Sequence, residues 1–266
     1  MILARLTLFD GILALTLAIV GIIWAHLGVL PPFGLQLSSG LFGFYFVVLG
    51  FFIAILGFII GVIALLVTFL MPSRRPGRAQ AVIGTILALI VVLPIFRIIQ
   101  ATRQYPAIND ITTDTKNSPS FVHAQTLPAN RSRDMSYKPE MAAVQEAAPV
   151  YGNLTPLKLP GPPDEVYKRV EIIAGEFPGW QVTYRDPVRH IVEGVANSTL
   201  FQFKDDFIIQ VEPASDGSDS MVEMRSKSRD GKGDLGTNYN RIESFFRALQ
   251  GPPRGVDVQS NSAGAS

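Results

Sequence analysis

Three long apolar runs, almost without charge, constrain this chain more than any other feature of its sequence. They cover residues 11–30, 41–71 and 79–99, and their ionisable residues apart from tyrosine are His26 in the first run and Arg97 near the end of the third. A helix of roughly 20 apolar residues crosses the hydrocarbon core of a bilayer, and Arg97 can extend to the interface. We therefore predict three transmembrane helices in a membrane domain over 1–103.

The first run resembles a signal peptide in position but not in detail. It follows the charged residues Arg5 and Asp10 and has no small-x-small cleavage site before Pro31. A cleaved leader normally has such a site. We expect a retained helix.

Arginines in the short connections give the membrane domain a direction. The connection 72–78 carries three arginines, whereas the connection 30–40 has no charge. Basic short loops stay in the cytoplasm, so the N-terminus is predicted inside and everything after residue 99 outside. In a bacterium, this describes a multi-pass inner-membrane protein with a periplasmic C-terminal domain.

Glycines recur along the second run at Gly43, Gly50, Gly57 and Gly61. Small residues at such spacings let membrane helices approach closely. Glycine is also frequent in membrane helices generally, so the spacing leaves both interpretations open.

Charge separates the two halves of the chain and limits its partners. Residues 1–103 contain six arginines and one acid, and the remainder holds 17 basic and 21 acidic residues. An acidic soluble half disfavours nucleic acid, which requires a basic surface. The chain has no cysteine, and His123 and His190 are isolated, so we predict no disulfide, metal site or cofactor.

The soluble half divides into an arm, a folded domain and a tail. Residues 104–160 read as an extended arm with one short helix at 139–148. In 161–250, helical periodicity at 162–177 and 237–249 encloses strands predicted at 180–184, 190–196, 207–212 and 221–229. This order predicts an α+β domain, an antiparallel four-strand meander flanked by two helices on one face. Residues 251–266 are predicted to be disordered.

A basic motif in the last strand is the first candidate site. Side chains alternate along a strand, so Arg225, Lys227 and Arg229 share one face. The glycine-rich segment 230–236, with Lys232, leads into a helix start where backbone N–H groups favour anions. Asn238 is the expected cap of that helix, and Arg241 lies one turn on. These residues predict an anion or lipid-headgroup site; a solvated strand face followed by a turn is the alternative.

A polar segment near the start of the arm is the second candidate. Hydroxyl and carboxylate groups of this kind can coordinate a hard cation or supply a general acid and base. They also commonly form turns and caps. If the segment folds back onto the basic strand, ion pairing explains both motifs without a ligand. The residues of this segment are Asp110, Thr112, Thr113 and Asp114. We add Asp230 and Asp234 of the glycine-rich segment 230–236 to give one possible polar cluster.

Three separated segments make the soluble half resemble a known but uncharacterised family. They are Ile-Asn-Asp-Ile-Thr-Thr-Asp at 108–114 with Pro119 and Phe121, Pro-Gly-Pro-Pro-Asp at 160–164, and Met-Arg-Ser-Lys-Ser-Arg-Asp-Gly-Lys-Gly-Asp-Leu-Gly-Thr-Asn at 224–238 with Arg-Ile-Glu at 241–243. Over roughly 105–250, the chain resembles domain of unknown function 1499. The resemblance implies an envelope or plastid association and brings no reaction or catalytic residue.

The sequence favours a membrane-anchored envelope module that binds an anionic ligand, a lipid headgroup or a protein partner near the bilayer. One alternative is an envelope hydrolase using Asp110 or Asp234 with the basic strand. Another is a structural protein that assembles with other membrane proteins. The sequence assigns no catalytic residue and no oligomeric state.

Overall fold

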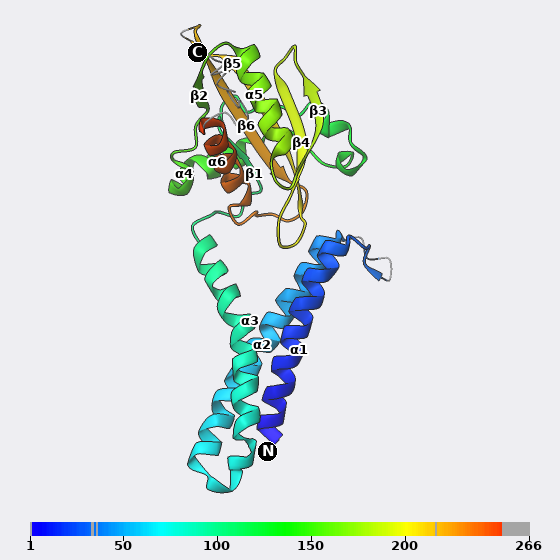
Figure 1. Cartoon of the computed structure of the whole chain (residues 1–266), viewed down its shortest axis with the longest axis vertical. Helices are drawn as coiled ribbons and strands as arrows, with labels where there is room; N and C mark the ends of the chain where they lie inside the picture. The colour runs from blue at the N-terminus through cyan, green and yellow to red at the C-terminus, as the bar shows by residue number, and fades with distance from the viewer. Residues whose placement is uncertain (1, 33–34, 36, 216, 252–266) are drawn as a thin grey trace, which may run out of the picture.

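The computed structural model describes residues 2–32, 35, 37–215 and 217–251, and Figure 1 shows their arrangement. Three long helices form an elongated bundle, and an α+β domain stands at one end of it. Residues 252–266, nearly all of the tail predicted to be disordered, lie outside the described residues.

The membrane half consists of three α-helices, each long and apolar enough to cross a bilayer, as predicted. Arg74 and Arg75 lie between the second and third helices, at the end of the bundle away from the domain (Figure 1). The arginine-rich connection and the domain are therefore at opposite ends. The elements are α1 (Ile2–Leu27), α2 (Ser39–Leu70), the 3-10 helix η2 (Pro72–Gly77) and α3 (Arg78–Thr102).

Helix α1 starts nine residues before the apolar run that predicts it. Arg5 and Asp10 limit the apolar run at its N-terminal side, but charged residues are compatible with a helical backbone, so the helix extends through both. Asp10 consequently lies inside α1 beside Gly57, where an added β-carbon would come within 2.9 Å of the Asp10 β-carbon. At the other end, Gly28 adopts φ +65° just after the helix, which stops three residues earlier than predicted.

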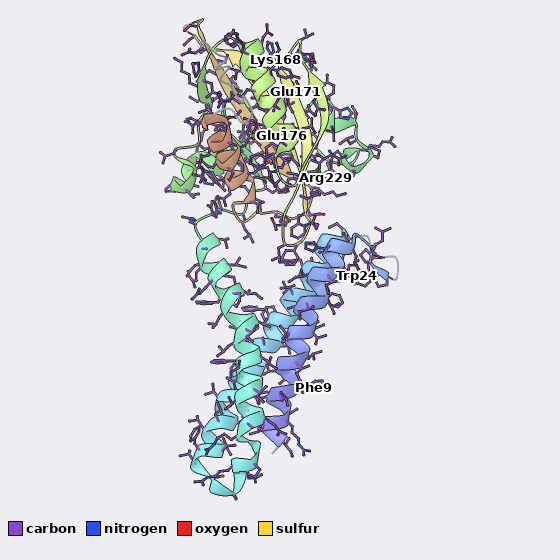
Figure 2. All side chains as sticks on the ribbon, viewed as in Figure 1. Phe9, Trp24, Lys168, Glu171, Glu176 and Arg229 are labelled. Carbon is purple, nitrogen blue, oxygen red and sulfur yellow. The ribbon has the colours of Figure 1, made fainter. Side chains whose placement is uncertain are left out.

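Small residues fill the contacts between the membrane helices, and large apolar residues point outward. Phe9, for example, is 60% exposed and points away from the bundle in Figure 2. This outer surface suits lipid chains, which provide no hydrophobic drive for packing helices together. The buried residues of α2 are Gly40, Gly43, Gly50, Ala54, Gly57, Gly61, Ala64 and Thr68.

The soluble domain is built on a six-stranded antiparallel sheet. Its strand order is β1-β6-β5-β4-β3, and β2 also pairs with β6. The predicted four-strand meander is present as β3 to β6. The sheet has two more strands than predicted because the arm supplies β1 and β2, both paired along the same edge of β6. The strands are β1 (Asp110–Thr112), β2 (Leu157–Pro160), β3 (Trp180–Asp186), β4 (Ile191–Asn197), β5 (Lys204–Pro213) and β6 (Asp219–Ser228).

Two helices cover one face of the sheet, as predicted. Helix α5 (Pro163–Glu176) starts with proline at its first position and acids in its first turn. Both features suit a helix N-terminus. Helix α6 (Thr237–Gln250) packs beside it, and both bury apolar side chains on Phe207 and Met224 of the sheet.

The arm covers the opposite face, which the sequence does not predict. Phe121 and Met135 of the arm pack on Ile208 of β5 in a second, smaller core. The predicted short helix is present as α4. The arm is therefore a third layer of the domain rather than a separate spacer. Its helical elements are η3 (Ala124–Thr126), η4 (Pro128–Asn130), α4 (Pro139–Ala147) and η5 (Pro149–Tyr151).

The turn between β4 and β5, residues 198–203, rests on the end of the membrane bundle (Figure 1). The Phe44 ring of α2 lies 5.4 Å from Phe201 and 6.2 Å from Phe203, between ring centroids. The hydroxyl of Ser38, which accepts a hydrogen bond from the Leu41 amide and so caps α2, donates to Asp230 Oδ2 at 2.9 Å. The domain is thus attached to the bundle both through α3 and through contacts at the start of α2.

Candidate functional site

The basic strand has the alternation that the sequence predicts, but its charged face is covered. Arg225 is 1% exposed, and the arm lies over it. Its Nε and Nη2 atoms donate to the two carboxylate oxygens of Asp110 at 2.8 Å each, and Lys227 Nζ donates to Asp110 Oδ2 at 2.6 Å. Because β1 pairs with β6 at these positions, the polar segment lies against the basic strand, and residues of both motifs share one ion-pair network.

Arg225 also holds the rest of the arm. Its guanidinium donates to the carbonyl oxygens of Pro119 (3.2 Å) and Met135 (2.9 Å). The rings of Phe121 and Tyr137 lie 4.9 and 5.3 Å from its central carbon. A buried guanidinium needs several acceptors to offset its lost hydration, and here the arm provides them.

A second ion-pair network lies further along the same face. Arg229 donates to both carboxylate oxygens of the buried Asp206, and Arg133 of the arm donates to Asp206 Oδ2 at 2.9 Å. Nearby, the buried Glu193 carboxylate accepts backbone N–H bonds from Val122, His123 and Ala124. The chain's own carboxylates therefore occupy the donors on this face.

The polar segment 110–114 forms strand and turn hydrogen bonds. Thr113 Oγ1 accepts from the Met224 amide, and Thr112 Oγ1 donates to the Asp114 carbonyl oxygen. Asp114 Oδ1 accepts from the amides of Lys116 and Asn117. These contacts match the turn and capping alternative.

The segment 230–241 organises the start of α6 differently from the sequence prediction. The capping group is Asp234, whose carboxylate accepts from the amides of Gly236 (3.0 Å) and Asn238 (2.8 Å). Asn238 is not the cap, because its side chain turns inward to accept from Ser226 and Arg241. Burial raises the pKa of Asp234, and the two backbone hydrogen bonds oppose that rise. Lys232 is exposed in the turn before the helix.

Arg241 completes this cluster on the helix-covered face of the sheet. It donates to the Asp205 carboxylate and, at 2.8 Å, to the Ser226 hydroxyl. The predicted site residues thus fall into separate groups: Arg225 and Lys227 under the arm, Arg229 beside them, and Asn238 with Arg241 on the other face.

A pocket of about 600 Å³ lies where the domain meets the membrane bundle, and we call it the junction pocket. Its membrane side consists of Leu41 and Phe44 of α2 with Phe201 and Phe203 of the β4–β5 turn. Phe177 and Trp180 extend the apolar wall into the domain. Its polar lining includes Asp205, Ser228, Asp230, Asp234, Thr237, Asn240, Arg241 and Ser244.

Sequence reasoning missed the junction pocket because its walls come from four distant parts of the chain. One signal was available. Two adjacent acids, Asp205 and Asp206, directly precede the apolar residues 207–209 of β5, and both acids are buried. Buried acids need partners, so such a pair indicates a charged partner on each face of the sheet. Nothing in the sequence around Arg133 indicates its role.

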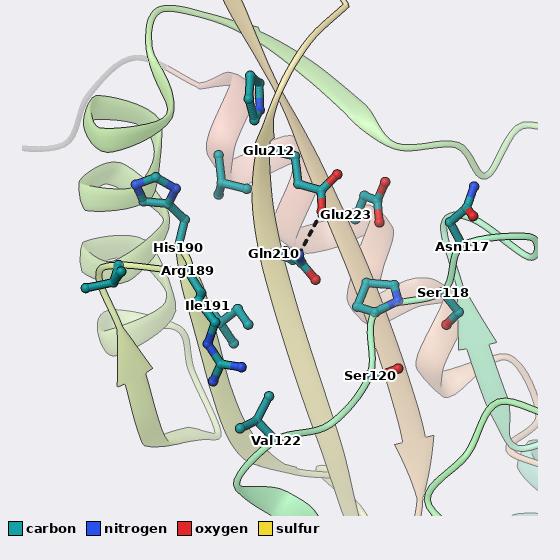
Figure 3. A pocket seen from close by; sticks show the side chains of 14 residues that line it. Asn117, Ser118, Ser120, Val122, Arg189, His190, Ile191, Gln210, Glu212 and Glu223 are labelled. Carbon is teal, nitrogen blue, oxygen red and sulfur yellow. Dashed lines mark hydrogen bonds between the residues drawn. The ribbon is translucent and has the colours of Figure 1, made fainter.

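A second pocket, of about 590 Å³, lies on the arm side of the sheet. In Figure 3, Glu212 of β5 and Glu223 of β6 lie next to each other, and Gln210 Nε2 donates to Glu212 at 2.7 Å. Asp110 and Arg229 line neither of the two pockets, and Asp234 lines only the first. These two pockets therefore do not join the three residues of the hydrolase alternative.

Glu223 predicts a pH dependence of stability. Burial raises its pKa to about 7, and repulsion from Glu212 and Asp114 adds to the rise. The stabilisation contributed by protonated Glu223 is present below its ordinary pKa and lost as the pH rises through about 7. Glu223→Gln should therefore raise the melting temperature at pH 8 but not at pH 4.5. The exposed-site control Glu176→Gln should change neither; equal curves for both variants would contradict the assignment.

Among the described residues, no group of three or more His, Cys, Asp or Glu side chains could hold a metal ion.

The fold and the two networks define a class of protein in which candidate membrane helices carry a three-layer α+β domain. The chain belongs to the family described as "Protein of unknown function (DUF1499)", whose model matches residues 110–249. That range covers the sheet, the arm from residue 110 onward, α4, α5 and nearly all of α6, but none of the membrane helices. No curated protein and no solved structure matches the chain.

Proposed function

We propose that this protein binds a lipid-like amphiphile in the junction pocket, at the surface of the membrane that anchors it. The supporting observation is the position of the pocket. Leu41 and Phe44 belong both to its wall and to a candidate membrane span, so an apolar chain can leave the bilayer without crossing water. Polar groups lie on the domain side, around Arg241 and Asp205, where a headgroup would be held.

The charges of the domain favour binding over hydrolysis. Asp110 accepts three hydrogen bonds from Arg225 and Lys227 and is fully buried, and Asp234 caps α6. Neither carboxylate is free to act as a general base toward a bound substrate, since a base must reach the proton it abstracts.

The membrane placement belongs to the same proposal: a bacterial inner membrane, with η2 in the cytoplasm and the domain in the periplasm. The chain has no cysteine, so single cysteines can report the side directly. We expect a membrane-impermeant maleimide to label Val188→Cys, an 87% exposed position in the domain, in intact cells. Ser73→Cys, in η2, should react only after lysis. The reverse labelling would overturn the placement.

Lipid binding can be tested with the full chain in nanodiscs that contain a lipid with a diazirine on its acyl chain. Lipids around the bundle label only the membrane helices, whereas a lipid in the junction pocket should also label residues 177–180 and 197–203. Ser244→Trp should abolish this domain labelling, because Ser244 is exposed and lines the pocket. Ile172→Trp, on the exposed surface of α5, is the matched control and should label like the parent protein. Labelling confined to the helices would reject the proposal.

A further inference from the structure

The charges that line the junction pocket are unequal. Three of its lining residues are acidic, namely Asp205, Asp230 and Asp234, whereas Arg241 is its only lysine or arginine among the described residues. Of the basic residues that the sequence assigns to an anion site, Arg241 lines this pocket, and Arg225, Lys227, Arg229 and Lys232 do not.

Arg241 is already committed to partners within the protein. Its guanidinium bonds to the Asp205 carboxylate, to Ser226 and to Asn238, and the residue is 8% exposed. An anionic headgroup would have to compete with Asp205 for this cation. With Arg241 and Asp205 neutralising each other, Asp230 and Asp234 determine the charge of the pocket.

Asp230 is the more accessible of these two acids. It is half-buried at the boundary between the domain and α2, and its carboxylate accepts a hydrogen bond from the Ser38 hydroxyl, a neutral donor. Its charge is therefore not neutralised through this contact. The Asp230 carboxylate therefore adds negative charge to the polar side of the pocket. An opposite charge placed near a half-buried carboxylate is favoured, and a like charge is disfavoured.

We infer that the junction pocket selects amphiphiles whose head carries an ammonium or hydroxyl donors and no net negative charge, in preference to anionic lipids. This inference rests on the proposed function and specifies its ligand class. An ammonium head can approach Asp230 at the level of the first turn of α2, while its chain extends along Phe44 and Phe203. Hydroxyl heads can donate to the same carboxylate without a charge of their own.

The test compares two probes with the same diazirine-bearing acyl chain, phosphatidylethanolamine and phosphatidylglycerol, in nanodiscs containing the full chain and equal amounts of both lipids. Labelling of residues 177–180 and 197–203 should favour the ethanolamine probe about fivefold, the effect expected for one charge at a partly solvated site. Asp230→Asn should reduce this preference, since the amide oxygen can still accept from Ser38 while the charge is lost. Glu140→Gln, which removes an exposed acid on α4, should leave the preference unchanged.

The outcomes separate the two proposals. If neither probe labels the domain, the proposed lipid site is wrong. If the glycerol probe labels it as well as or better than the ethanolamine probe, lipid binding stands and the headgroup inference is overturned. An unchanged preference in Asp230→Asn would also overturn the inference, because it places the selectivity elsewhere.

Discussion

Replacing Arg225 by methionine is expected to lower the free energy of unfolding of the soluble domain by about 3–5 kcal/mol, the usual effect of removing one partner from a buried ion pair. The change leaves Asp110 buried with Lys227 as its remaining cation. It also leaves the carbonyl oxygens of Pro119 and Met135 without their donor. Arg225→Lys should not rescue the domain fully, since one ammonium cannot reproduce the paired geometry of a guanidinium.

This effect can be measured by urea unfolding of the full chain in detergent, in a Trp24→Phe background. The fluorescence of Trp180 then reports on the domain core, where the centroid of its ring lies 4.1 Å from the centroid of the Phe207 ring. Arg189→Met provides the control, because Arg189 forms an ion pair with Asp186 and its own side chain is 50% exposed. Such surface pairs contribute about 0–1 kcal/mol. If both variants unfold at the same urea concentration, Arg225 does not hold the arm.

Strand periodicity predicts the faces of β6 correctly but not what covers them. The alternation of Arg225, Lys227 and Arg229 with Val222 and Met224 is what the structure has. Whether a charged face meets water or another segment depends on contacts distant in sequence. In this domain, the covering segment is part of the arm, residues 113–137. This segment lacks the periodicity that would predict its packing.

Short strands and distant junctions limit prediction in the same way. Strand β1 has three residues, too few to show an alternating pattern, and it forms because β6 offers a free edge beside it. The junction pocket requires the β4–β5 turn to contact α2, and no local pattern encodes that contact. The uncharged turn residues Leu200, Phe201 and Phe203 are a signal of it only after the fold is known.

The membrane spans were the most predictable part, because length and lack of charge suffice to identify them. Their packing is specified by the small residues that the sequence leaves open to two interpretations. Gly43 of α2 and Gly21 of α1 face each other so closely that a β-carbon on Gly21 would lie 2.5 Å from the Gly43 carbonyl oxygen. A β-carbon on Gly43 would likewise overlap the Gly21 carbonyl oxygen. The glycines of α2 therefore allow close helix contact, and the general abundance of glycine in membrane helices does not by itself explain them.

Gly43→Leu should consequently separate α1 from α2. Because the backbone of Gly21 must move, rather than a flexible side chain, we expect the bundle to lose about 1–3 kcal/mol of stability or more, as is typical of overpacking. The change also displaces Phe44, the next residue, which contacts Phe201 and Phe203 of the domain. Unfolding in mixed micelles with increasing SDS, followed by helical circular dichroism, should show a lower midpoint. Thr16→Leu adds bulk to an exposed position of α1 and should leave the midpoint unchanged. Equal midpoints for the two variants would mean that close approach at Gly43 does not stabilise the bundle.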